Sequence, residues 1–428
     1  MDIRLPEPAR CRCHRPAQQP DDPQHRQEVM RDVVADREPA RLQKIILQPN
    51  AYESTRVPRF VMNVAFLTTA REGGELVHVQ EVAERLATCH DCTIDVYHLH
   101  DTSVQPTADG LTNYRIADAF GSGGIAELAY NADVVRRIRS GDYDVVHAHS
   151  YTATFATQLL RLFDETPVVY TAHGAALDFS VRYAGPPYDY LYTALQRLLM
   201  KRFTYDRIVT ENHELKGVLE TYHDTVEYIP NGADVDVFPE PTGFDTKELL
   251  FVGRLRPKKN VGDAIAAMES IVSEHPSAHL HIVGNGPLEG ALADQIDSRG
   301  IADSVTMHGY VARHSEALLD LYRRSSLFLL PSDWEGQPLV LLEAWASGIP
   351  IVGADAVGIR EFVRKTGYGV VTPLNDPERL AATVVDLLDR PDQLRTWGEG
   401  ARAHVARRYS WERIAARTYE TYQKVRND

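Results

Sequence analysis

Four cations lie within six residues near the middle of the chain, directly after a short apolar run. The segment reads Phe251-Val-Gly253-Arg254-Leu-Arg256-Pro-Lys258-Lys259-Asn260. A strand that ends at a glycine, followed shortly by the first turn of a helix, offers unpaired backbone N–H groups and the positive end of a helix dipole. Arg254 and Lys259 add charges of the kind that bind phosphate. The segment therefore predicts a diphosphate site, with a solvated basic turn as the alternative.

Two glutamates further along, Glu335 and Glu343, are eight residues apart, which is slightly more than two helical turns. If a helix begins near Leu339, both carboxylates can point toward one ligand. Glu335 would accept sugar hydroxyls and Glu343 ribose hydroxyls, and the backbone N–H groups from Gly336 to Leu339, Pro338 excepted, would add donors. Surface charge is the alternative, and the basic segment upstream favours the ligand site.

The surrounding sequence alternates between short apolar runs and helical patterns. The runs indicate strands at 60–67, 94–97, 145–147, 168–170 and 207–209 in one half, and at 249–252, 279–283, 305–307, 327–330 and 349–352 in the other. Helical patterns in the second half lie at 261–274, 288–299, 315–324 and 340–347. Such alternation is typical of βαβ units and a parallel sheet. We therefore predict an α/β fold of two Rossmann-like, doubly wound parallel-sheet domains that face each other across a cleft.

Changes in composition and turn residues suggest where these domains begin and end. Residues 1–58 lack sustained periodicity and are expected to be a disordered extension, or a segment before a true start at Met62. The predicted parts are a first domain at 59–230 on the acceptor side, a linker at 231–247, a second domain at 248–408 on the donor side and a helix at 409–428 that crosses back to the first domain.

The composition is that of an ordinary globular enzyme, with 43% apolar and 25% charged residues in 428. A net charge of −14 argues against non-specific binding to nucleic acid or to an anionic membrane. There is no apolar run of about 18 residues and no apolar segment of a signal peptide at the start. With four cysteines in a chain of this length, a reducing interior and a cytoplasmic location are expected.

One apolar stretch, residues 190–203, carries basic residues at its end. It could lie on a membrane surface that holds a lipid acceptor. A packed helix is the favoured reading, so we expect at most a peripheral contact at the inner membrane face.

Several patterns that resemble metal or cofactor sites are read as structural. The cysteine spacings fit no zinc template, the acidic pairs lie away from the expected diphosphate, and a proline interrupts the glycine pattern that would bind a dinucleotide. No metal and no cofactor are expected. The patterns are Cys11-Arg-Cys13-His14 with Cys89 and Cys92, Asp142-Tyr-Asp144, Asp234-Val-Asp236, and Gly284-x-Gly286-x-x-x-Gly290.

Taken together, these motifs resemble those of the retaining glycosyltransferases of family four, which have the GT-B fold. The resemblance covers about residues 60–425. In chain order it rests on Gly73-Gly74, Asp144-Val-Val-His147-Ala-His149, Tyr170-Thr-Ala-His173-Gly174, Ile229-Pro-Asn231-Gly232-Ala-Asp234, Gly253-Arg254 with Lys259, Val283-Gly284-Asn-Gly286-Pro287, Glu335 with Glu343, Ala346-Ser-Gly-Ile-Pro350 and Tyr409-Ser-Trp411-Glu.

The resemblance implies roles at the diphosphate. Arg254 and Lys259, with Gly253 at the strand end before them, would hold the nucleotide diphosphate and stabilise the charge that develops on it as the glycosidic bond breaks. Gly74, at the first strand–helix turn, would let the backbone approach that phosphate.

The resemblance also implies roles along the rest of the donor. Glu335 and the backbone groups of Gly336 to Leu339 would hold the donor sugar, Glu343 the ribose, and the loop from His308 to Val311 the nucleobase. Many members have an aromatic residue and then a glycine two and three places after the first glutamate. Gln337 and Pro338 stand there instead, so a differently shaped donor pocket is expected.

Two histidines complete the implied site. His149 would sit near the donor sugar and the acceptor, and His173 is a candidate on the acceptor side, with a structural histidine at a strand end as its alternative. The catalytic set implied by the resemblance is His149, Arg254, Lys259 and Glu335.

The sequence as a whole predicts a metal-independent, retaining glycosyltransferase of the hexosyltransferase type. Its donor would be a nucleotide-diphosphate sugar, with a UDP-sugar considered first. The acceptor stays open between a lipid, a sugar and a polysaccharide. The alternatives on the same scaffold are a nucleotide-sugar epimerase, a phosphorylase and an inactive sugar-nucleotide-binding protein.

Overall fold

The structure of the protein is a computed structural model that describes residues 61–100, 108–116, 124–173 and 188–428. These ranges belong to one unit of the chain, Val61–Asp428. The disordered extension predicted at 1–58, and with it Cys11, Cys13 and His14, lies outside the described residues.

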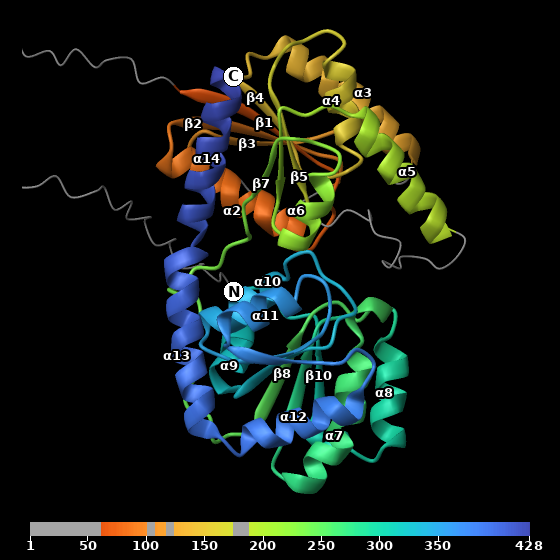
Figure 1. Cartoon of the computed structure of the whole chain (residues 1–428), viewed down its shortest axis with the longest axis vertical. Helices are drawn as coiled ribbons and strands as arrows, with labels where there is room; N and C mark the ends of the chain where they lie inside the picture. Colours follow the sequence, from red (N-terminus) through yellow and green to blue (C-terminus); the bar gives the residue numbers. More distant parts are fainter. Residues whose placement is uncertain (1–60, 101–107, 117–123, 174–187) are drawn as a thin grey trace, which may run out of the picture. The chain divides into compact units, whose positions relative to one another are not determined.

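The first half is built around a parallel sheet of seven strands in the order β3-β2-β1-β4-β5-β6-β7 (Figure 1). Its strands are β1 Met62–Thr68, β2 Cys92–His98, β3 Leu111–Arg115, β4 Val145–Ala148, β5 Val168–Ala172, β6 Arg207–Thr210 and β7 Val226–Tyr228. Its helices are α2 Gly74–Cys89, α3 Gly124–Ser140, α4 Thr154–Leu160, α5 Tyr188–Arg202 and α6 His213–Leu219.

The second half repeats the plan with six parallel strands in the order β10-β9-β8-β11-β12-β13. Its strands are β8 Glu248–Val252, β9 His279–Val283, β10 Val305–Gly309, β11 Leu327–Leu330, β12 Ile351–Ala354 and β13 Gly369–Thr372. Its helices are α7 Val261–Glu274, α8 Glu289–Ser298, α9 Glu316–Arg324, α10 Leu339–Ala346, α11 Arg360–Thr366, α12 Pro377–Leu388 and α13 Pro391–Arg408.

Two doubly wound parallel sheets confirm the predicted fold class. Strands such as β11 are apolar at every position and buried throughout, as expected where helices cover both faces of a parallel sheet. The helices begin where the sequence offers a cap: the side chains of Ser315 and Asp376 accept hydrogen bonds from the backbone N–H groups of Leu318 and Arg379. Local sequence and burial therefore favour the same elements.

The last helix, α14 (Trp411–Asn427), follows the second half but packs on the first (Figure 1). Trp411, Ile414 and Tyr422 are buried in one apolar cluster with Val79 and Leu86 of α2. The Tyr422 hydroxyl also lies 2.6 Å from Nδ1 of His147 in β4. The chain between β7 and β8, where the linker was predicted, leads into the second sheet.

Three strands escaped the sequence prediction, and one was misplaced. β3 is polar and only partly buried at the edge of its sheet, and β7 has three residues. β13, also an edge strand, is mostly half-buried. β12 begins at Ile351 instead of residue 349. Edge strands lack the continuous apolar run that marks a central parallel strand. None of the helices that the structure describes is long and apolar enough to cross a bilayer.

Candidate functional site

The basic segment lies at the carboxyl end of β8, as predicted. Backbone N–H groups of Gly253 and Leu255 donate to the carbonyl oxygens of Val283 and Asn285 at 2.9 and 2.8 Å. A Cβ atom at Gly284, whose φ is +133°, would lie 1.9 Å from the Gly253 carbonyl oxygen. Only glycine allows so close an approach. The glycine motif after β9 therefore packs directly against the backbone of the basic segment.

Lys259 and Glu335, predicted from separate motifs, meet in the structure. The Lys259 ammonium lies 2.5 Å from Oε1 of Glu335, and their side chains are only 14% and 8% exposed. Burial raises the pKa of Glu335, but Lys259 and Lys258 together lower it by more than burial raises it. The pKa of Glu335 therefore lies below its ordinary value. The carboxylate is therefore held ionised. Lys258 lies over the ring of Trp334 at 4.0 Å, which fixes the two loops to each other.

Arg254 extends from the second half to the first. Its Nη1 lies 2.7 Å from Oε1 of Glu72, and the two side chains are 42% and 64% exposed. Its Nη2 would lie 3.6 Å from a Cβ atom on Gly73, which has a φ of +94° directly before α2. Gly74, the glycine singled out from the sequence, instead faces Leu339. A phosphate bound by Arg254 would thus lie near the start of α2.

The loop before α10 is anchored to the first half. α10 begins at Leu339, where the spacing of the two glutamates required it. Oε1 of Gln337 accepts a hydrogen bond from the backbone N–H of Asn231 at 2.5 Å, and the Gln337 carbonyl accepts one from the Asn231 side chain at 3.0 Å. The Gly336 carbonyl accepts a hydrogen bond from the Asn212 side chain at 2.8 Å. Gln337, predicted to contact the donor, therefore holds the two halves together with its carbonyl oxygens.

Glu343 is buried and engaged by two partners. Its Oε1 accepts a hydrogen bond from Nε of Arg313 at 2.9 Å, and its Oε2 accepts one from the Tyr322 hydroxyl at 3.1 Å. Arg313 also pairs with Glu81 of α2 at 2.7 Å. Val311, two residues before Arg313, is half-buried against an apolar cluster of the second half. A ribose bound by Glu343 would share this carboxylate with Arg313, a residue that the sequence did not single out.

A chain of titratable groups follows three adjacent strands of the first sheet. His149, His173 and Glu211 each come one residue after the end of β4, β5 or β6. Nδ1 of His149 lies 3.3 Å from Nε2 of His173, and Nδ1 of His173 lies 3.7 Å from Oε2 of Glu211. Because carboxyl ends of parallel strands meet at one edge of a sheet, the topology itself brings these groups together. Glu211 was not singled out from the sequence.

The histidines of this cluster differ in the direction of their pKa shifts. Burial lowers the pKa of His149 well below its ordinary value. Burial also lowers the pKa of His173, but the Glu211 carboxylate raises it by more, so it lies above its ordinary value. His78 of α2, whose ring centre is 4.7 Å from that of His173, has a pKa lowered by burial to about 3.

The ring nitrogens of this cluster lie close enough together to be compared with a metal site. Across the described ranges, His78, His149 and His173 form the one group of three ligand atoms close to one another, within 4.8 Å. Tetrahedral zinc with Zn–N distances of about 2.0–2.1 Å places its nitrogens about 3.4 Å apart. The 3.3 Å pair of His149 and His173 fits that spacing, but these two nitrogens already share a hydrogen bond.

The other metal-like patterns serve the fold. Asp234 pairs with Arg85 and accepts a hydrogen bond from the Trp411 backbone at 3.0 Å. Asp144 accepts one from the Asn63 backbone at 2.8 Å. The Cys92 thiol is buried, which raises its pKa to about 12.

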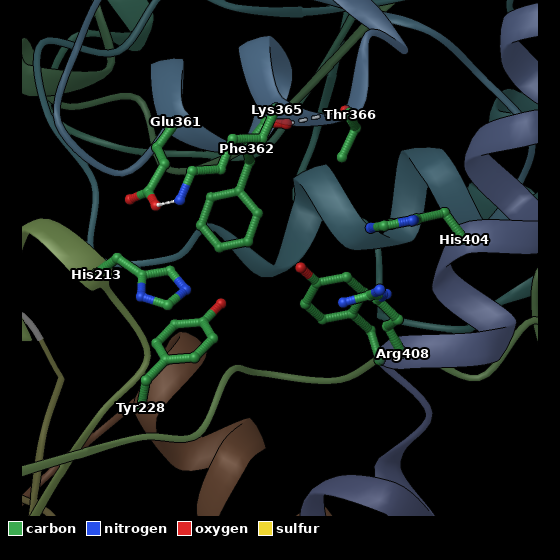
Figure 2. A pocket seen from close by; sticks show the side chains of 9 residues that line it. His213, Tyr228, Glu361, Phe362, Lys365, Thr366, His404 and Arg408 are labelled. Atoms are coloured by element: carbon green, nitrogen blue, oxygen red, sulfur yellow. Dashed lines mark hydrogen bonds and ion pairs between the residues drawn. The ribbon is translucent and has the colours of Figure 1, made fainter.

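A separate pocket with a volume of about 360 Å³ involves none of the predicted site residues. Figure 2 shows that α11 contributes the paired Glu361 and Lys365, with His213 and Tyr228 facing them from the first half. The rings of His213 and Tyr228 stack at 3.6 Å. Phe362, Thr366, His404, Arg408 and Tyr409 complete the lining.

Comparisons with known proteins match both halves. Residues 73–237 match the model of Glycosyltransferase Family 4, and residues 234–404 match that of Glycosyl transferases group 1. The chain is similar to the D-inositol 3-phosphate glycosyltransferase of Thermobispora bispora, with 29% identity over 83% of this chain and 91% of that protein. It is also similar to the glycogen synthase of Mycobacterium tuberculosis, with 30% identity over 66% of this chain and 69% of that protein.

Among solved structures, the chain resembles Alr3699/HepE of Anabaena in complex with UDP-glucose, with a TM-score of 0.70 and 19% identity over 85% of this chain and all of that one. This likeness agrees with the two-sheet GT-B architecture described above. The matches to both halves, together with the identity over most of the glycogen synthase, show that the chain belongs to the group 1 and family 4 glycosyltransferases.

Proposed function

We propose that the protein transfers a hexose from a nucleotide-diphosphate sugar, a UDP-sugar first, to an acceptor, with retention of configuration and without a metal ion. The observation that carries this proposal is the buried pair of Lys259 and Glu335 beside Arg254. The pair joins a phosphate-binding cation to an ionised hydrogen-bond acceptor. The UDP-glucose complex of the structural relative supports the choice of nucleotide for the first test.

In this proposal, cations stabilise the leaving group. Lys259 has three donors, of which one faces Glu335. The others, with the guanidinium of Arg254, would bind the diphosphate and stabilise the charge that forms as the glycosidic bond breaks. Because these side chains supply positive charge where other glycosyltransferases use a metal, they support metal independence.

Glu335 is suited to hold the donor sugar. Its ionised carboxylate has no proton to donate, and Lys259 already engages one oxygen. A carboxylate held in this way would accept hydroxyl hydrogen bonds and orient the sugar. Retention would then proceed through a front-side, oxocarbenium-like route in which a leaving phosphate oxygen accepts the acceptor's proton.

The first experiment is a thermal-shift panel of UDP, GDP and ADP, each with and without EDTA. A nucleotide at 100 times its dissociation constant stabilises a folded protein by about 2.7 kcal/mol. A shift from UDP that survives EDTA is expected. A shift lost with EDTA would contradict metal independence, and no shift from any nucleotide would contradict a working diphosphate site.

The second experiment separates transfer from its alternatives. The UDP-sugar that shifts the melting temperature is incubated with the protein and followed by proton NMR, first alone and then with candidate acceptors. A product with the donor's anomeric configuration is expected only with an acceptor. Conversion of the donor to another sugar nucleotide without acceptor would indicate an epimerase, and binding without turnover would indicate an inactive protein.

The acceptor side carries an unusual apolar surface. Helix α5 buries polar side chains and exposes leucines: Thr193 and Gln196 are 1% and 3% exposed, whereas Leu191 is 70% exposed. The Thr193 hydroxyl and Oε1 of Gln196 have no hydrogen-bond partner within the described ranges. The sequence favoured a packed helix, and α5 does pack, through Met200, which is fully buried in the apolar cluster of the first half. The outward leucines and the buried polar side chains were not predicted. In water, a helix gains stability by the opposite orientation.

This surface extends over α3, α4 and α5, which lie together in the first half (Figure 1). It holds nine of the thirteen large apolar side chains that are exposed in the described part of the chain, a clustering that marks interaction sites. A pocket of about 550 Å³ opens among them. The nine are Leu128, Phe155, Leu159, Leu162, Phe163, Tyr190, Leu191, Leu195 and Leu198.

Cations border the apolar surface. Arg137 and Arg139 lie in the last turn of α3, and Lys201 and Arg202 in the last turn of α5. The guanidinium of Arg139 lies 4.8 Å from the ring centre of Phe163. An apolar surface bordered by basic residues suits an anionic membrane surface. On this basis we extend the proposal: the protein works at the cytoplasmic face of the membrane on a lipid or lipid-linked acceptor.

A further inference from the structure

One carboxylate and two histidines lie in a row at the edge of the first sheet. Glu211, His173 and His149 follow three neighbouring strands, and their facing atoms are 3.7 and 3.3 Å apart. Nε2 of His149 is buried and has no hydrogen-bond partner among the residues that the structure describes. We propose that Glu211 and His173 are positioning residues that set the tautomer of His149, so that Nε2 of His149 carries the hydrogen presented to the substrate.

The argument follows from the two nitrogens of each ring. The Glu211 carboxylate favours a proton on Nδ1 of His173, the nitrogen that faces it. When His173 is protonated, its Nε2 also carries a hydrogen and donates it to Nδ1 of His149. His149 must then carry its own hydrogen on Nε2. Loss of one proton from His173 reverses this bond: Nδ1 of His149 becomes the donor and its Nε2 an acceptor.

The hydrogen bonds of His78 and His147, which also lie in this cluster, do not compete with the contact between His173 and His149. His78 donates from Nδ1 to Oδ1 of Asn231, because the amide group of Asn231 is already the donor to the Gln337 carbonyl. Both ring nitrogens of His147 have partners, at 2.6 Å to the Tyr422 hydroxyl and at 2.7 Å to the Thr171 hydroxyl.

The charges that act on His173 come from three elements. Burial lowers its pKa, but Glu211 after β6 and Glu75 on α2 raise it above its ordinary value. His78 on α2 has a pKa lowered to about 3, and His147 and His149 in and after β4 have pKa values well below the ordinary one. Of these four histidines, His173 is therefore the first to take up a proton as the pH falls.

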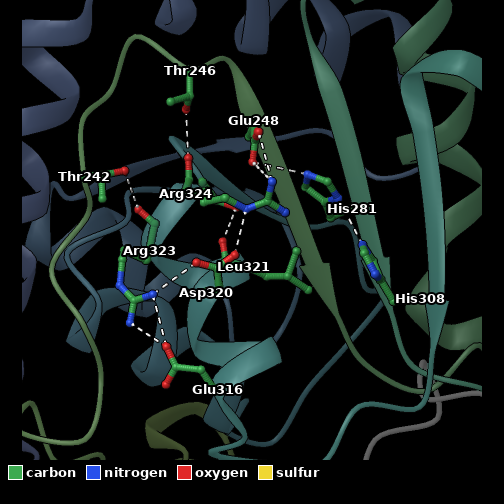
Figure 3. Close-up of polar contacts among 11 residues, drawn as sticks. Thr242, Thr246, Glu248, His281, His308, Glu316, Asp320, Leu321, Arg323 and Arg324 are labelled. Atoms are coloured by element: carbon green, nitrogen blue, oxygen red, sulfur yellow. Dashed lines mark hydrogen bonds and ion pairs between the residues drawn. The ribbon is translucent and has the colours of Figure 1, made fainter.

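The second half contains the same order of groups in a different electrostatic setting, which provides a control. Figure 3 shows Glu248 beside His281, and His281 beside His308, at 3.3 and 3.0 Å. Here Arg324 shares the Glu248 carboxylate at 3.4 Å. Burial, with contributions from His279, Arg324 and His308, lowers the pKa of His281 to about 4. The central histidine of this second group therefore has a lowered pKa, whereas that of His173 is raised.

The direct test reads the tautomer of His149 by NMR. Full-length protein labelled with 15N in histidine is compared with His149→Asn to assign the ring signals, and spectra are recorded at pH 6 and pH 8. At pH 6, a hydrogen on Nε2 of His149 is expected in the wild type. In Glu211→Gln the hydrogen is expected on Nδ1 at the same pH, whereas Glu248→Gln keeps the wild-type signals of His149. A tautomer that is unchanged in Glu211→Gln and at both pH values would overturn the proposal.

Activity supplies a second reading, and it rests on the proposed transfer function. The kcat of the wild type is expected to fall as the pH rises through the pKa of His173, above about 6.5, because the donor at Nε2 is lost. Glu211→Gln should show the same fall at lower pH, with full kcat restored at the acid end and little change in donor KM. A uniform loss at every pH would indicate a structural role only.

Two controls keep the failures apart. If UDP fails to shift the melting temperature of the wild type, the proposed function fails. The NMR measurement of the His149 tautomer needs no substrate and still tests the roles of Glu211 and His173. If the purified protein holds one zinc ion per chain that both His78→Asn and His173→Asn lose, the cluster is a metal site, and the proposal that Glu211 and His173 set the tautomer of His149 is wrong.

Discussion

The ammonium group of Lys259 lies 2.5 Å from the carboxylate of Glu335, although 76 residues separate the two in sequence. One comes from the turn after β8 and the other from the loop before α10, and both side chains are largely buried. The residues that we propose to contact the donor sugar and the diphosphate therefore form a single charged unit. Changing either residue alters the other's charge environment.

Replacing Lys259 by Ala is expected to cost both stability and activity. The substitution leaves the Glu335 carboxylate buried beside Lys258 alone, which destabilises the fold by about 3 kcal/mol. It also removes a cation that would stabilise the leaving diphosphate, which lowers kcat/KM about a hundredfold or more. Urea denaturation and donor turnover measure the two. The matched control is Lys365→Ala, which removes an exposed ammonium group from its pair with Glu361 and should cost less than about 1 kcal/mol. Equal losses in the two variants would show that the Lys259 pair has no special role.

The stability that Glu335 contributes should depend on pH in one direction. Its folded-state pKa lies below the ordinary value of 4.5. Its contribution is therefore fully present above that value and lost as the pH falls through the folded pKa. The difference in unfolding free energy between wild type and Glu335→Gln should be constant from pH 7 to pH 5 and shrink below 4.5. A difference that grows on acidification would reverse the sign and contradict the ionised carboxylate.

Glu72 should compete with a bound diphosphate for Arg254. Both side chains are largely solvent-exposed, so the pair is weak, and its removal should raise UDP affinity only about two- to fivefold. Isothermal titration of Glu72→Gln at low salt measures the gain. The gain should vanish in an Arg254→Ala background, and it should also diminish at high ionic strength. Improved binding in Glu72→Gln that persists without Arg254 would place the competition elsewhere.

The exposed leucines of α5 should control membrane binding without affecting the fold. Replacing Leu191 and Leu195 by Ser should abolish sedimentation with phosphatidylglycerol vesicles, whereas the melting temperature stays within about 2 °C, because both side chains are exposed. Leu374→Ser, at an exposed position in the second half, is the matched control. Equal binding to phosphatidylcholine vesicles would contradict the contribution of the basic residues. A dimer in solution that the double variant dissociates would identify a second copy of the chain as the partner.

The sequence predicted those parts of the site that depend on local pattern. The helical pattern at 340–347 lies within one residue of α10 at each end, and the glycine after β8 located the basic turn, because both signals are local in the sequence. The parallel sheets followed from runs of apolar residues that recur along the whole chain.

The partners across the two halves could not be read in the same way. Glu72 pairs with Arg254, and Glu81 pairs with Arg313. In each pair the two residues are more than 180 positions apart in the sequence, and no local pattern marks either glutamate. Glu211 follows β6 as a single acid between Thr210 and Asn212, and it becomes significant only through the sheet order that places it beside His173. For α5 the sequence left a membrane surface open beside the favoured packed helix, because periodicity shows that a helix has an apolar face but does not show toward what that face is turned.

Helix α14 also has a consequence for how the protein is made. It follows both sheets in the chain and is therefore synthesised after them, yet Trp411 and Tyr422 are fully buried in the core of the first half. The apolar cluster that these side chains share with Val79 and Leu86 of α2 can therefore be completed only after the whole second half has been made. The folding of the first half thus depends on residues from which the second half separates it along the chain.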